Sequence, residues 1–154
     1  MIDLIHNSLV SAYLRQSIWL YPLINAGHII GLGLLIGSIA PLDLRLLGIW
    51  RTVPISPLVR VLVPVTIAGL ALSITCGVML FITRPGEYLS SALFISKMCF
   101  LALGLINAAT IRMSAAWKSA LSSNLLSNRV RIHSIASMLI WGSVIIFGRL
   151  VGYR

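Results

Sequence analysis

The chain has 154 residues, of which 58% are hydrophobic and 10% are charged, with a mean hydropathy of +1.00. Soluble domains carry about 25% charged residues, so this composition excludes an ordinary soluble protein and indicates an integral membrane protein. The formal net charge is +9, but the basic residues stand mostly at the ends of apolar segments, which predicts contact with lipid headgroups and no nucleic-acid partner.

The first segment, residues 1–16, is predicted to be an amphipathic helix that lies in the membrane interface. Ile2, Ile5 and Leu9 share one helical face, as expected for a helix of this kind. The segment lacks the basic start and the continuous apolar core of a cleavable signal peptide.

Four later segments are long and apolar enough to cross a bilayer: residues 18–40, 62–82, 90–112 and 132–151. At about 1.5 Å per helical residue, each approaches or exceeds the roughly 30 Å of the hydrocarbon core. The connections are short, and no part is large enough for a separate soluble domain. The sequence therefore predicts one all-α domain, an integral membrane four-helix bundle.

The first span contains the small-residue pairs Gly27/Gly31 and Gly33/Gly37. Such pairs let helices approach closely, either within one subunit or in a homo-oligomer. We expect Pro41 to end this helix, because proline cannot continue the hydrogen-bond ladder.

The connections carry their own signals. Residues 51–60, with two prolines, are predicted to form an ordered, extended loop. A turn from Thr83 to Glu87 is expected to end the second span. The Ser/Asn-rich segment from Ser114 to Asn128 is expected to form a helical extension and a mobile loop.

Orientation follows from the basic residues. Seven lie around the connections after the first and third spans, against four on the opposite side: Arg45, Arg51, Arg60, Arg112, Lys118, Arg129 and Arg131 against Arg15, Arg84, Arg149 and Arg154. Cytoplasmic loops are enriched in Lys and Arg. We expect a multi-pass protein of the bacterial inner membrane with both termini in the periplasm.

His28 is the first candidate for chemistry, because it interrupts an apolar run from Ile18 to Ala40. Its expected depth is about 15 Å from the outer face, and that of Lys97 is about 10 Å. Ionisable side chains avoid lipid and face the interior of a bundle. An interior His and Lys at similar depth predict a site for a cofactor or for protons.

Two cofactors fit these residues. Haem b would be bound by the neutral imidazole of His28, with Lys97 or Arg149 paired to the propionates. A soft metal such as Cu(I) is the alternative, because Cys76 and Cys99 are expected at similar depth, with Met79 and Met98 close to them in sequence.

The sequence also predicts roles for the remaining polar residues. His133 is a candidate second haem ligand, although its predicted depth near the cytoplasmic face counts against pairing with His28. Asp43 and Arg45 are expected to act as a structural clamp, Asp43 with Arg112 and Arg45 with loop carbonyls. Asn107 is expected to form an interhelical hydrogen bond.

Three stretches carry a resemblance: WLYPLINAGHIIGLGLLIGSIAPLDLRLLG, FISKMCFLALGLINA and SMLIWGSVIIFGRLVGY. Together they resemble an uncharacterised bacterial inner-membrane family with a DLRLLG signature, which implies the fold. More distantly the layout is similar to HemJ-type protoporphyrinogen oxidases and to CopD-like copper-resistance membrane domains. The resemblance to the former implies haem b, with His28 and Lys97 matching that family's histidine and lysine. The segment from Pro41 to Arg45 and the fourth span depart from its pattern.

The first hypothesis is therefore a haem-b-binding membrane protein with a redox or electron-transfer role, which includes the possibility of a membrane oxidoreductase. The alternatives are a cofactor-free structural or accessory subunit of a larger membrane complex, and a copper or small-solute transporter.

Overall fold

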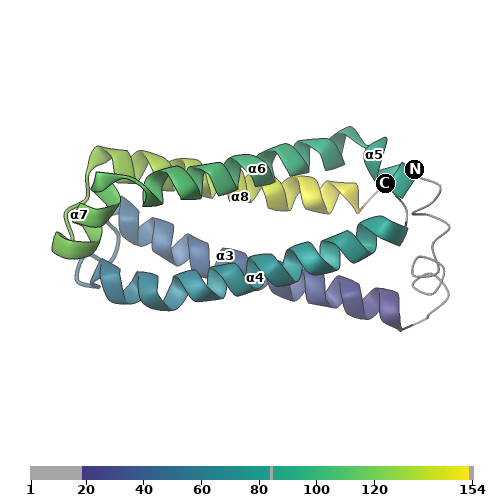
Figure 1. Cartoon of the computed structure of the whole chain (residues 1–154), viewed down its shortest axis with the longest axis horizontal. Coiled ribbons are helices and arrows are strands. Elements are labelled where there is room, and N and C mark those ends of the chain that lie inside the picture. Colours follow the sequence, from purple (N-terminus) through teal and green to yellow (C-terminus); the bar gives the residue numbers. More distant parts are fainter. Residues whose placement is uncertain (1–18, 84, 153–154) are drawn as a thin grey trace.

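The computed structural model describes residues 19–83 and 85–152. All regular elements in these ranges are helices (Figure 1): α3 Leu20–Leu47, α4 Ile55–Thr83, α5 Pro85–Leu89, α6 Ala92–Arg112, α7 Ala115–Ser123 and α8 Asn128–Val151. Within the described ranges, the four long helices α3, α4, α6 and α8 are long and apolar enough to cross a membrane. The all-α four-helix bundle is confirmed, and the interfacial helix predicted for residues 1–16 lies outside the described residues.

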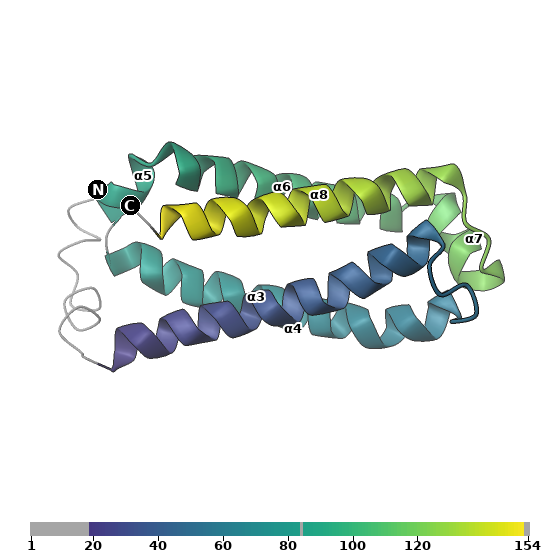
Figure 2. The same cartoon turned by 180° about the vertical axis from the view of Figure 1, so that it is seen from behind.

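The bundle consists of two helix pairs. α3 packs along α4, α6 packs along α8, and the pairs meet where α3 lies against α8 (Figure 1, Figure 2). The Cα atoms of α4 and α6 stay more than 8 Å apart along their whole lengths. An interior crevice between the pairs results, and it holds the candidate sites.

The first glycine pair of α3 produces the close crossing with α4. A Cβ atom on Gly31 would lie 2.9 Å from the carbonyl oxygen of Gly69, and one on Gly69 would lie 2.8 Å from the carbonyl oxygen of Gly31. Only residues without a Cβ allow backbones to come this close. A Cβ on Gly33 or Gly37 would have no neighbouring atom within 4 Å, so the second pair makes no such crossing within the described part of the chain.

The prediction that Pro41 ends the first span is wrong. α3 continues for six residues to Leu47 with Pro41 inside it. Membrane helices tolerate a proline, because the loss of one hydrogen bond does not outweigh the packing of the helix. The helix ends instead at Gly48, whose φ of 105° is left-handed and whose N–H donates to the carbonyl of Arg45, in the manner of a glycine C-cap.

The next connection is shorter than expected. α4 begins at Ile55, so the predicted extended loop over residues 51–60 is wrong for its second half. The N–H of Ile55 donates to Oδ1 of Asn124 at 2.9 Å, so the side chain of the residue that follows α7 caps this helix. The second span ends at Thr83 as expected, but the residues from Pro85 to Glu87, which were expected to form a turn, belong to the short helix α5.

The segment between the third and fourth spans contains α7, which confirms the helical part of its prediction. Ser114 caps α7, with its Oγ accepting the N–H of Trp117 at 3.2 Å. Trp117 and Ala120 are buried in a cluster with Leu46 and Val130. α7 therefore closes one end of the bundle.

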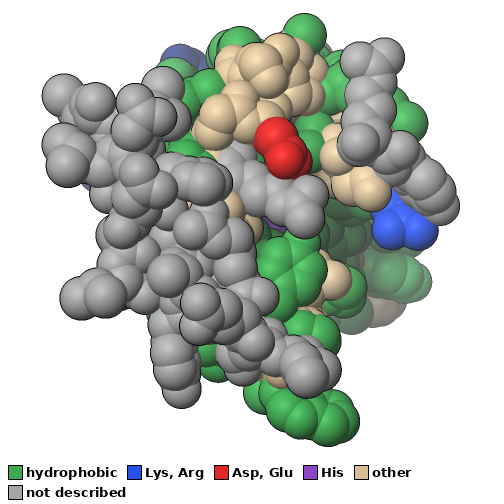
Figure 3. Space-filling model, turned by 90° about the vertical axis from the view of Figure 1, so that its right-hand side faces the viewer, with side chains coloured by type: hydrophobic (Ala, Val, Ile, Leu, Met, Phe, Trp, Pro, Cys, Tyr) green, Lys and Arg blue, Asp and Glu red, His purple; other side chains and the backbone are tan. Residues whose placement is uncertain are grey.

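The outer surface is apolar. No more than 22% of the most hydropathic stretch of any spanning helix is buried inside the protein. The large hydrophobic side chains that are exposed are mostly Leu, Ile, Val and Met. Seen from the α5 end, hydrophobic side chains also dominate the described surface (Figure 3). Such a surface suits hydrocarbon rather than water.

Candidate functional site

The crevice between the helix pairs contains two cavities. The first, which we call the His28 cavity, has a volume of about 330 Å³ and lies toward α5. The second, the Asp43 cavity, has a volume of about 320 Å³ and lies toward α7. Leu35, Leu70 and Trp141 line both, so these three side chains separate them.

The imidazole of His28 is oriented by α4. Its Nδ1 lies 2.7 Å from the carbonyl oxygen of Ser73 and 3.3 Å from the Oγ of the same residue. A carbonyl only accepts, so Nδ1 donates its hydrogen, and in the neutral ring Nε2 keeps its lone pair. A Cβ on Gly77 would lie 3.2 Å from Cε1 of His28. The absence of a side chain there lets the ring lie against α4.

Lys97 projects from α6 into the same cavity. A Cβ on Gly148 of α8 would lie 3.5 Å from Nζ of Lys97. The lysine side chain therefore passes over α8 at a residue that has no side chain. Lys97 has no hydrogen bond or ion pair with any residue of the described ranges. His28 and Lys97 thus line one cavity in the interior of the bundle.

The other walls of the His28 cavity are apolar, and none of its lining residues is acidic. The rings of Phe81 on α4 and Phe94 on α6 stack at 5.7 Å between centroids, which bridges the two helices near α5. Four lining side chains are exposed on the outside: Ile74 at 44%, Val78 at 52%, Leu89 at 46% and Met98 at 37%. They belong to α4, α5 and α6, so the cavity opens toward lipid on the side where these helices lie.

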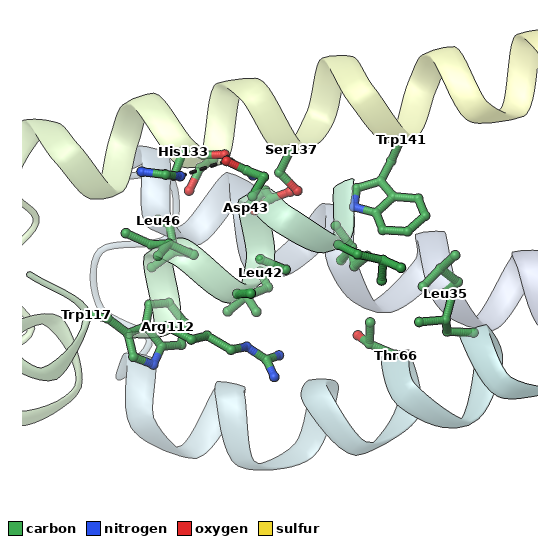
Figure 4. Close-up of a pocket in the computed structure, with 18 of the residues that line it drawn as sticks. Leu35, Leu42, Asp43, Leu46, Thr66, Arg112, Trp117, His133, Ser137 and Trp141 are labelled. Carbon is green, nitrogen blue, oxygen red and sulfur yellow. Dashed lines mark hydrogen bonds between the residues drawn. The ribbon is translucent and has the colours of Figure 1, made fainter. Parts of the chain in front are cut away.

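The Asp43 cavity is more polar (Figure 4). Asp43 is 6% exposed, and its Oδ2 has no hydrogen-bond partner among the described residues. Asn107 donates from Nδ2 to the carbonyl of His133 at 3.0 Å, and its Oδ1 accepts from Nδ1 of His133 at 2.7 Å. The interhelical hydrogen bond predicted for Asn107 is thus confirmed, with α8 as the partner helix.

Of the two parts of the clamp predicted for Asp43 and Arg45, only the part that involves Arg45 is confirmed. Arg45 is 2% exposed and donates from Nε to the carbonyl of Val53 at 2.6 Å and from Nη2 to that of Arg51 at 3.2 Å. It binds loop carbonyls as expected. Asp43 and Arg112 line the same cavity but form no ion pair, so that part of the prediction is wrong. The reason is packing, because α3 lies on α4 and α8 and not on α6.

His133, Arg149 and the two cysteines do not line the His28 cavity. His133 lines the Asp43 cavity, so within one chain the two histidines do not face a common ligand. Arg149 lies in the last turn of α8 and lines neither cavity. Cys76 is buried against α3, whereas Cys99 is exposed. Within the described ranges, no three His, Cys, Asp or Glu side chains are grouped as metal ligands.

Sequence reasoning missed the face of α4 that receives His28. Gly69, Ser73 and Gly77 follow at intervals of four residues and share one helical face. This repeat of small residues could have predicted that face. It contains the residue at the helix crossing and the residues against which the imidazole of His28 lies.

No family model, curated protein or solved structure matches the chain.

Proposed function

We propose that the chain is an integral membrane protein that binds haem b in the His28 cavity and has a redox or electron-transfer role. The observation that supports this most is the hydrogen bond from Nδ1 of His28 to the carbonyl of Ser73. It favours the tautomer whose Nε2 has a free lone pair, and histidines that bind metals are commonly oriented in this way.

The cavity fits an amphipathic, anionic group of this kind. Its apolar and aromatic walls suit the body of a porphyrin, and Lys97 offers a positive charge to a propionate. Met98 is another lining side chain of a type that binds haem iron. The volume of about 330 Å³ is at the low end of the roughly 300–1,000 Å³ of ligand pockets, so a macrocycle would extend into the opening between α4 and α6.

Bound haem would supply one-electron chemistry. The residues of the chain would hold the iron through His28, fix the ring of that histidine through Ser73, and balance negative charge through Lys97. The apolar walls would keep water from the site. Arg149 has no part in this proposal, because it lies outside the cavity.

The test is an absorption spectrum of the protein purified in detergent from cells supplied with haem. We expect a Soret band that disappears in His28→Ala and persists in His133→Ala. The second variant is a matched control, since His133 also lies on a spanning helix but lines the other cavity. A colourless preparation would refute haem binding and leave a cofactor-free subunit as the interpretation.

A further inference from the structure

The Asp43 cavity opens toward lipid on the side of α4 and α6. Its exposed lining residues all belong to these two helices: Ile67 of α4, and Leu105, Ala109 and Arg112 of α6. The lining residues from α3, α7 and α8 are buried or half-buried. The Cα atoms of α4 and α6 stay more than 8 Å apart. A molecule in the bilayer can therefore reach this cavity between the two helices.

Two arginines stand at the α7 end of this opening. Arg60 lies near the start of α4, and Arg112 is the last residue of α6. Both side chains are exposed. Ile111, next to Arg112, is buried in a cluster against which Val59, next to Arg60, packs. The two arginines therefore lie at a similar level, where the spanning helices end.

Each arginine lies on one wall of the opening. Arg60, Ile67 and Ile74 follow at intervals of seven residues, close to two helical turns, and share one face of α4. Ile67 lines the Asp43 cavity, and Ile74 lines the His28 cavity. Arg112 itself lines the Asp43 cavity, and in Figure 4 its guanidinium extends toward α4. The opening thus has a positive charge on each side.

No acidic side chain among the described residues neutralises these arginines. The chain has three acidic residues, of which the structure describes Asp43 and Glu87. Asp43 accepts a hydrogen bond from Ser137 and lies on the other side of Leu42 from the guanidinium of Arg112 (Figure 4). Glu87 belongs to α5, at the opposite end of the bundle. The compensating negative charge therefore comes from outside the described part of the chain.

The walls next to the arginines are mostly apolar. Ile67 and Leu70 line the cavity from α4, and Leu105 and Ala108 line it from α6. Ile67 is 55% exposed and Leu105 is 40% exposed, so this wall is continuous with the lipid-facing surface. A ligand with a negative head and a long apolar chain fits such an opening.

We propose that one anionic phospholipid binds between α4 and α6, with its phosphate between Arg60 and Arg112 and one acyl chain along Ile67 and Leu105. A guanidinium binds a phosphate through two parallel hydrogen bonds. Lipid surrounds a protein whose helices cross the membrane, so this ligand is always at hand. In a zwitterionic lipid the positive head group competes with the arginines for the phosphate, so the site prefers a lipid with a net negative charge.

Tryptophans report on the acyl chain. Trp117 and Trp141 line the Asp43 cavity and are only 8% and 5% exposed, so lipid on the outer surface hardly contacts them. The other two tryptophans are exposed and are replaced in the test protein by Trp19→Phe and Trp50→Phe. A brominated acyl chain quenches an indole only at close contact. The full-length protein is reconstituted in phosphatidylcholine vesicles with increasing fractions of brominated phosphatidylglycerol or brominated phosphatidylcholine, and its fluorescence is compared with that in the same lipids without bromine.

We expect brominated phosphatidylglycerol to reach half-maximal quenching at an at least about tenfold lower mole fraction than brominated phosphatidylcholine, because both arginines favour an anionic lipid. Arg60→Gln and Arg112→Gln should each reduce this preference by about fivefold. Arg129→Gln is the matched control, because it removes the same charge at the start of α8, where Arg129 is exposed and lines neither cavity. It should preserve the preference.

Several results would overturn the proposal: no quenching of the two cavity tryptophans, equal quenching by the two brominated lipids, or an unchanged preference in Arg60→Gln and Arg112→Gln. A loss in Arg129→Gln as large as in these variants would also overturn it, because the attraction would then come from all the basic residues at this end. The comparison of the two lipids decides even if an arginine variant does not fold. His28→Ala should leave the preference unchanged, so this proposal and haem binding succeed or fail separately.

Discussion

The crossing of α3 and α4 can be tested by adding one methyl group. In Gly69→Ala the new Cβ would lie 2.6 Å from the backbone nitrogen of Leu35 and 2.8 Å from the carbonyl oxygen of Gly31. Both atoms belong to the backbone of α3, so no side-chain rotation relieves the overlap. One helix has to move away from the other, and contacts on both sides of the crossing are lost.

The expected cost follows from two opposing terms. Overpacking a well-packed contact costs about 1–3 kcal/mol. Replacing glycine by alanine inside a helix stabilises it by about 0.5–1 kcal/mol. Gly33→Ala is the matched control, because nothing lies within 4 Å of its Cβ position. Both variants gain the same helix stabilisation from alanine. The difference between their free energies of unfolding therefore measures the cost of the steric overlap at Gly69. We expect Gly69→Ala to be about 1–3 kcal/mol less stable than Gly33→Ala, near the upper end of this range.

The assay is reversible unfolding in mixed micelles with increasing dodecyl sulfate, followed by circular dichroism. The free energies of unfolding of the two variants are compared under the same micelle composition. Equal stability of Gly69→Ala and Gly33→Ala would refute the close crossing described above, because the added methyl would then have met no backbone.

Three further changes test the polar contacts. Arg45→Lys should lower the free energy of unfolding by about 1.5–3 kcal/mol, because the single nitrogen of lysine cannot take the positions of both Nε and Nη2 of Arg45; an unchanged value in the same titration contradicts the role of these bonds. A double-mutant cycle with Asn107→Ala and His133→Ala should give a coupling of about 0.6–1.7 kcal/mol, whereas zero coupling would show that the hydrogen bond between their side chains is not formed. Gly77→Ala would place a Cβ 3.2 Å from Cε1 of His28, so we expect it to lower the haem content per chain in the absorption assay; full haem content would argue against the ring position.

The sequence predicted the spans well and their ends poorly. Hydropathy identified all four spanning helices, because lipid imposes one length and one polarity on each. It could not show that α3 runs past Pro41 to Leu47. That boundary is set by Gly48, a local cap, and by burial of Leu46 in the cluster that contains Val130 and Trp117, which is a tertiary feature.

For the candidate sites, too, one feature was predicted correctly and another was not. Counting residues from the membrane surface placed His28 and Lys97 at similar depth, and both line one cavity. Depth alone does not fix the direction in which a side chain points around its helix. This is why Asp43 and Arg112 were expected to pair although α3 and α6 do not pack together.

Trp141 couples the shapes of the two cavities. Its ring is 5% exposed and fits over Gly104, where a Cβ would lie 3.1 Å from the indole. With Leu35 and Leu70 it lines both cavities. A change in the position of the indole would therefore alter the shape of the two cavities together.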